Sequence, residues 1–164
     1  VLGTNTGYAY HPIQRWGNSG TGTASFVLYH FQQYTSASIN DGRTNLFTWY
    51  ANVNGIGWTT ISSSTGRLNT YPQTYWMGFQ YWVDSGNIYG QRWLNGEKGS
   101  LYVRSHGTGT GALGSGTGGV GIQSDPDNNY NNIHWVKQTS LYSRTLSDNE
   151  MLRHWQIAKV KHGL

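Results

Sequence analysis

The chain has 164 residues, a formal net charge of +4, no cysteine, and Asp, Glu, Lys and Arg at only 11% of its positions. The lack of cysteine excludes disulfides and thiolate metal sites, and no apolar run approaches the roughly 20 residues of a membrane-spanning helix. The length is that of one domain with its own hydrophobic core, so we expect a single domain over residues 1–164.

The composition favours β-structure. Aromatic residues make up 15% of the chain, with eight Trp and twelve Tyr, and there are 23 Gly. Aromatic side chains suit strands, while glycine with Asn, Ser and Thr suits the turns between them. The chain begins VLGTNTGY, without an initiator Met and without the basic start and apolar core of a signal peptide. We therefore expect either a processed chain or a piece of a longer one.

Short strands separated by turn signals follow one another along most of the chain. Alternating or aromatic-rich runs predict strands at 23–34, 45–53, 57–63, 75–83, 87–94, 99–105, 119–124 and 132–143. Asn54-Gly55 and Asn95-Gly96 are hairpin turn signals, and Asp84-Ser85-Gly86 marks a further turn. This pattern predicts an all-β fold, a two-sheet antiparallel β-sandwich or jelly roll.

The glycine-rich run HGTGTGALGSGTGGVG at 106–121 interrupts the strands. A dinucleotide-binding fingerprint needs a helix to begin at its last glycines, whereas this run leads into a predicted strand. We interpret it as a long loop that either orders against another body, such as a neighbouring subunit, or is simply mobile.

One short helix is predicted at the end of the chain, from Ser147 to about Lys161. Ser147 and Glu150 have the spacing of a capping box, and Asp148 suits the positive end of the helix dipole. Leu146 and Met151 hold the positions of a hydrophobic staple. The two carboxylates of LYSRTLSDNEMLRHW are therefore interpreted as structural rather than reactive.

Basic residues gather near the same helix. Five of the eleven lie between residues 137 and 164. They either attract an anionic surface or form a solvated helix face that complements the dipole, and the second interpretation is favoured because the run is sparse. We expect no nucleic-acid partner.

Enzymatic motifs are missing from the sequence. Glycoside hydrolysis needs two carboxylates that flank one bond, and neither Glu97 nor Glu150 lies within a predicted strand. No serine occupies a nucleophile elbow, and the six His lack a zinc-binding spacing. We expect no catalytic residues, and a polysaccharide-degrading enzyme is the least favoured alternative.

The loop SDPDNNYNN at 124–132 is the stretch whose side chains most resemble a ligand site. Its oxygen-bearing side chains could hold calcium or a sugar, or could stabilise a turn through their own backbone. For a ligand site we single out Asp125, Asp127, Asn128, Asn129 and Tyr130. Asp125 and Asp127 are the candidate calcium ligands.

The aromatic excess points to a recognition surface. Trp and Tyr can cover the apolar face of a sugar ring, although any single Trp of a sandwich strand is more often part of the core. Eight Trp and twelve Tyr exceed what a small core hides, so some should be exposed. Trp76 and Trp82 are added to the candidate ligand site for this reason.

The end of the chain resembles a known family. The run VGIQSDPDNNYNNIHWVKQTSLYSRTLSDNEM resembles the closing strands of laminin-G-like, concanavalin-A-like domains, in which a long strand ends in Y-x-R-x-L-[ST]-x-x-E before a helix. Here that ending is Tyr142, Arg144, Leu146, Ser147 and Glu150. The hairpin RWLNGEKGSLY is similar to one of the family, whereas the acidic pair that often precedes the strand's end is replaced by Lys137 and Gln138.

The resemblance implies a jelly roll with a non-enzymatic recognition role. Such domains bind glycans or proteins at a loop rim, often with calcium, and versions with this ending look like those appended to phage virion or bacterial surface proteins. We therefore expect a carbohydrate-binding module in a virion or at a cell surface. The alternative is a structural decoration protein that contacts other virion subunits or its own copies.

Overall fold

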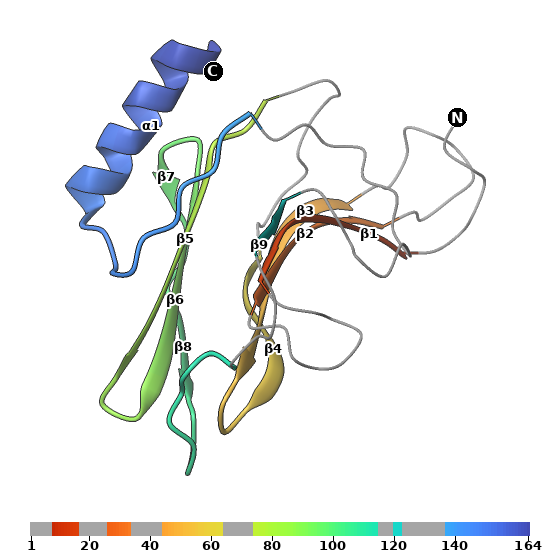
Figure 1. Ribbon diagram of the computed structural model, residues 1–164, viewed down its shortest axis with the longest axis vertical. Helices are drawn as coiled ribbons and strands as arrows, with labels where there is room; N and C mark the ends of the chain where they lie inside the picture. The colour runs from red at the N-terminus through yellow and green to blue at the C-terminus, as the bar shows by residue number, and fades with distance from the viewer. Residues whose placement is uncertain (1–7, 17–25, 34–43, 64–73, 115–119, 123–136) are drawn as a thin grey trace.

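The computed structural model describes residues 8–16, 26–33, 44–63, 74–114, 120–122 and 137–164, with side chains described at 49–61, 74–114 and 137–164. These segments form nine strands in two antiparallel sheets, followed by one helix (Figure 1). The strands are β1 (Tyr8–Trp16), β2 (Phe26–Gln33), β3 (Thr44–Val53), β4 (Gly57–Ser63), β5 (Met77–Asp84), β6 (Asn87–Leu94), β7 (Glu97–Lys98), β8 (Tyr102–Ser105) and β9 (Val120–Ile122), and the helix is α1 (Asp148–His162).

Sheet A has the strand order β4-β3-β2-β1-β9. In sheet B, β5 pairs with one side of β6, while the short strands β7 and β8 both pair with β6 as well. The two sheets lie beside each other as layers, and α1 lies on the side of sheet B that faces away from sheet A (Figure 1). The all-β prediction with one C-terminal helix is confirmed at this level.

A hydrophobic core joins the two sheets. Trp49 of β3 has only 6% of its surface exposed, and its ring meets Phe79 and Tyr81 of β5 edge-on, at centroid distances of 5.4 and 6.1 Å. Ile61 of β4 and Ile88 of β6 are fully buried in the same cluster. Burial of side chains from both layers is the main force that holds sheet A against sheet B.

Three predicted turns are confirmed by their backbone geometry. Ser85 and Gly86 have φ of 49° and 78°, and Asn95 and Gly96 have φ of 48° and 84°. Two successive positive φ values define the tight turn whose twist matches antiparallel strands, so these pairs close the β5–β6 and β6–β7 hairpins. Gly55, with φ of 94°, lies in the turn between β3 and β4.

The predicted strand at 132–143 is wrong over its described part, because residues 137–143 form no strand. The strand predicted at 99–105 begins later than predicted, as β8 at Tyr102, because Gly99–Leu101 form no strand. β1 was missed: it contains Pro12, and a shift in its pairing with β2 falls between Pro12 and Gln14. Proline removes a backbone donor and favours bulges, so a strand that contains one is easily overlooked.

The first part of the glycine-rich run, residues 106–114, packs against the same chain. Leu113 forms a bridge with Val53, and the amides of Asn54 and Gly111 reach the carbonyls of Ala112 and Asn54 at 2.9 and 3.1 Å. This half of the run therefore orders against the β3–β4 turn of the same chain, contrary to our interpretation of it. Residues 115–119 lie outside the described part.

Candidate functional site

The loop at 124–132, for which the sequence predicted ligand or calcium contacts, lies outside the described residues. This applies to every loop residue singled out as a ligand or calcium contact: Asp125, Asp127, Asn128, Asn129 and Tyr130. Within the described segments, no group of three or more His, Asp or Glu side chains could hold a metal ion. The calcium and loop-binding hypotheses therefore stay predictions.

The Trp76 side chain packs between β5 and α1. Its amide donates to Asn95 Oδ1 at 2.9 Å, and its ring meets that of Trp155 with centroids 6.2 Å apart. A Cβ atom built on Gly78 would come within 2.3 Å of the Met151 methyl group and 3.2 Å of the Trp76 ring. The absence of a side chain at Gly78 thus lets the helix approach the sheet, and Trp76 helps to fix it there.

Strand alternation divides β5 between two environments. Phe79 and Tyr81 face sheet A, because both contact Trp49. Successive side chains of a strand point to opposite faces, so Gln80 and Trp82 lie on the outer face of sheet B. In agreement, Gln80 Oε1 accepts a hydrogen bond of 2.8 Å from the amide of Leu146, which precedes the helix.

The outer face of sheet B carries an aromatic row. Trp82 is opposite Tyr89 in the β5–β6 pairing, and Tyr89 is opposite Val103 in the β6–β8 pairing. The Trp82 and Tyr89 rings are stacked, with centroids 5.2 Å apart and planes only 5° from parallel. Both rings are half-buried, and Val103 is 50% exposed. The three side chains form an apolar strip across the sheet, which we call the aromatic row.

A polar row lies next to the aromatic row. Asp84, Asn87 and Ser105 are each two residues along the strand from a member of the aromatic row, and the pairing sets them opposite one another. The period of two places them on the same outer face. Asp84 and Ser105 are exposed, and Asn87 is half-buried. Carboxylate, amide and hydroxyl groups therefore border the aromatic strip.

The helix leaves this end of sheet B uncovered. α1 lies over the end of the sheet near β7, whereas the β5–β6 turn is at the opposite end (Figure 1). Asp84 accepts a bond of 3.1 Å from its neighbour Ser85, and Ser105 accepts one of 3.2 Å from the amide of Gly107. These local bonds orient the polar row and leave acceptor capacity on the carboxylate.

The other aromatic candidates differ in exposure. Trp49 and Trp93 are 6% and 2% exposed and belong to the interior. Tyr81 donates a hydrogen bond to the carbonyl of Gly111, and burial followed by the neighbouring Tyr102 raises the pKa of Tyr81 to about 12. Trp58 of β4 is 43% exposed but belongs to sheet A.

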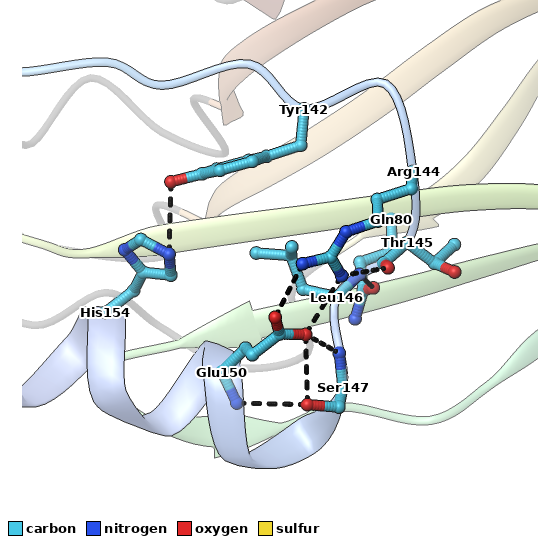
Figure 2. A network of polar contacts seen from close by, with 8 residues as sticks. All are labelled: Gln80, Tyr142, Arg144, Thr145, Leu146, Ser147, Glu150 and His154. Carbon is cyan, nitrogen blue, oxygen red and sulfur yellow. Dashed lines mark hydrogen bonds and ion pairs between the residues drawn. The ribbon is translucent and has the colours of Figure 1, made fainter.

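The charged cluster at the start of α1 is structural (Figure 2). Ser147 Oγ accepts from the Glu150 amide at 3.3 Å, and the Glu150 carboxylate accepts from the Ser147 amide at 2.8 Å. The predicted capping box is therefore confirmed. The two terminal nitrogens of Arg144 donate to the same carboxylate at 2.6 and 3.0 Å. These bonds, together with those from Ser147, lower the pKa of Glu150 to about 2.

Residues 137–146, which we call the strap, connect to the helix through alternate side chains. Three contacts join them: Lys161 Nζ donates to Gln138 Oε1 at 3.0 Å, Tyr142 Oη lies 3.0 Å from His154 Nε2, and Arg144 pairs with Glu150. The strap thus runs antiparallel to α1 in an extended form. Among the described residues, the strap forms no backbone hydrogen bond to a neighbouring strand, and its Leu146 amide is bonded to the Gln80 side chain instead, which explains why no strand forms.

Sequence reasoning selected Trp82 but missed its neighbours Tyr89, Asp84, Asn87 and Ser105. The signal was present in the Ser85-Gly86 turn, because a two-residue hairpin pairs Asp84 with Asn87 and hence Trp82 with Tyr89. The contribution of β8 was not visible, because its register depends on the break at Gly99–Leu101.

The described part of the chain holds no helix with the length and hydropathy that a membrane crossing requires. Comparison with known proteins gives no match to a family model, to a curated protein or to a solved structure.

Proposed function

We propose that the chain is a non-enzymatic recognition module that binds a glycan on the outer face of sheet B. The observation that carries the proposal is the aromatic row beside the polar row at the uncovered end of the sheet. An aromatic ring covers the apolar C–H face of a sugar, while nearby carboxylate, amide and hydroxyl groups hold its hydroxyls. Trp82 and Tyr89 would supply the first contact, and Asp84 with Asn87 the second.

The same rows support binding rather than hydrolysis. Asp84 is the one carboxylate among the six residues of the two rows, whereas glycoside hydrolysis uses two carboxylates on either side of the bond. A single carboxylate can accept hydrogen bonds from two sugar hydroxyls, which is a binding role. We therefore assign no catalytic residue.

The family and the setting of the module are also part of the proposal. A laminin-G-like jelly roll is supported by the two antiparallel sheets and by the capped helix that follows the Tyr142–Glu150 motif. The strap departs from the family pattern, because a strand is expected there. A module of this kind would act in a virion or at a cell surface, where glycans are exposed.

A glycan array compares the wild-type chain with the Trp82→Ala and Asp84→Ala variants. Loss of the ring or of the carboxylate should weaken binding to a bound glycan by about tenfold or more, the equivalent of roughly 1.4 kcal/mol. Trp58→Ala is the control, because it removes an exposed Trp from the opposite sheet. Equal loss in all three variants, or no glycan bound by the wild type, would refute the proposal.

The same array, run with and without calcium, distinguishes binding on the outer face of sheet B from binding at the predicted loop 124–132. A double variant, Asp125→Ala with Asp127→Ala, should leave binding unchanged if the outer face of sheet B is the site. Calcium-dependent binding that this double variant abolishes and Trp82→Ala preserves would instead place the glycan at residues 124–132.

A further inference from the structure

Exposed apolar side chains are concentrated on the strap and helix α1. Within the described residues, the large hydrophobic side chains that are exposed in this region are Leu141, Tyr142, Leu152, Ile157 and Val160. Val160 has 88% of its surface exposed and Ile157 has 54%. A helix that packs on a sheet normally directs its aliphatic residues inward, so their outward position needs an explanation.

The contacts of α1 settle which of its faces is covered. Met151 is buried and Trp155 packs against Trp76, so this side faces sheet B. His154 contacts the strap. With 3.6 residues per turn, two rows then run along the outward side. The rows are Leu152–Gln156–Val160 and Arg153–Ile157–Lys161, which we call the outward helix face. Lys161 lies at the edge of this face, where it also donates to Gln138 of the strap.

The outward helix face is cationic as well as apolar. No acidic residue follows Glu150 in the chain, and the two acids of α1 are already paired, Asp148 with Lys98 and Glu150 with Arg144. In the described part of the chain, no carboxylate pairs with Arg153 or Lys161. Among the described residues, the charge of this face is therefore not neutralised.

We propose that the outward helix face is a docking surface for a partner protein that presents an acidic, apolar-lined groove. An amphipathic helix commonly docks by placing aliphatic anchors into a groove. Ile157 and Val160, three residues apart, have the spacing of such anchors, and Leu152 adds an exposed aliphatic group at the start of the same face. Acidic groups of the groove would pair with Arg153, which lies among these anchors, and with Lys161 at their edge, and this pairing speeds association and fixes orientation.

Charge complementarity disfavours the other occupants. A second copy of the chain would bring the same cations against Arg153 and Lys161, and like charges across an interface oppose association. The phosphates of a nucleic acid would pair with the cations, but a nucleic acid would leave the aliphatic side chains exposed. An anionic bilayer would admit Ile157 and Val160, yet Gln156 and Arg153 lie between the apolar positions and interrupt the continuous apolar face that insertion needs.

A display library of random 20-residue peptides, selected on the immobilised full chain, tests the proposal. The selected peptides should be rich in Asp or Glu together with Leu, Ile or Phe. Their affinity should fall at least tenfold for Arg153→Glu and for Ile157→Asp, and should decrease with added salt. Arg104→Glu is the matched control, because it makes the same charge change on β8, away from the helix.

Each variant is first checked by its far-ultraviolet circular dichroism, so that loss of binding is not loss of the helix. Selection of no peptide, or of peptides that bind the Ile157→Asp and wild-type chains equally, would overturn the proposal. Co-sedimentation with vesicles of phosphatidylglycerol and phosphatidylcholine would overturn it in favour of a membrane surface. Glycan binding should be unchanged by Ile157→Asp, so the two proposals fail independently.

Discussion

The carboxylate of Glu150 illustrates how single residues position the end of this chain. It accepts hydrogen bonds from the amide and hydroxyl of Ser147 and from both terminal nitrogens of Arg144 (Figure 2). One side chain therefore fixes the first turn of α1 and the last residues of the strap together. The spacing of Ser147 and Glu150 predicted the cap, whereas the ion pair of Arg144 with Glu150 depends on the path of the strap and could not be predicted from spacing.

Ser147→Ala should destabilise the fold by about 1 kcal/mol, because the Glu150 amide loses its acceptor. A thermal melt measures the effect, and Ser143→Ala in the exposed strap is the control. An unchanged melting temperature for Ser147→Ala would show that the cap contributes nothing.

The contribution of Glu150 should depend on pH. Its pKa falls from 4.5 to about 2 on folding, so the folded state favours the charged carboxylate. Stabilisation by a group with a lowered pKa is present above its unfolded value and disappears as the pH falls through its folded value. The stability difference between wild type and Glu150→Gln should therefore be full at pH 7 and shrink between about pH 4.5 and 2. Urea unfolding across this range measures it, and a constant difference would contradict the assignment.

Among the elements, the segment 106–114 and the strap behave opposite to their sequence patterns. The glycine-rich segment was interpreted as a loop that either orders against another body or is simply mobile, yet it docks on the β3–β4 turn, where the Asn54 side chain accepts from the Thr110 amide at 2.9 Å. The strap has an alternating strand pattern but contacts the helix instead. Both predictions were wrong because a local sequence pattern carries no information about tertiary contacts, here those with the β3–β4 turn and with α1.

Gly109→Ala tests the docking of the glycine-rich segment. A Cβ at this position would lie 2.4 Å from the Gly55 Cα and 2.5 Å from the Asn54 carbonyl oxygen, so backbone must move. Overpacking of this kind typically costs about 1–3 kcal/mol. Chemical unfolding measures the loss, with Thr108→Ala in the same segment as the control. Equal stability of the two variants would mean that the segment is not held against the turn.

At the scale of the whole molecule, the sequence predicted the sheets better than the site. Period-two patterns and the Asn-Gly and Ser-Gly turns identified most strands, because alternation and turn geometry are local properties. The site depends on register: Trp82, Tyr89 and Val103 meet only through two strand pairings. Trp76 and Trp82 looked equivalent in the sequence, and only the position of α1 distinguishes the ring that packs from the ring left at the uncovered end.

The central claim is that the aromatic row on sheet B binds a glycan. Fluorine NMR of the chain labelled with 5-fluorotryptophan reports each of the eight Trp separately, and the Trp82→Phe variant assigns its signal. Addition of a glycan selected on the array should shift the Trp82 signal and leave that of Trp58 unchanged. A Trp82 signal that stays fixed at saturating glycan would contradict the account.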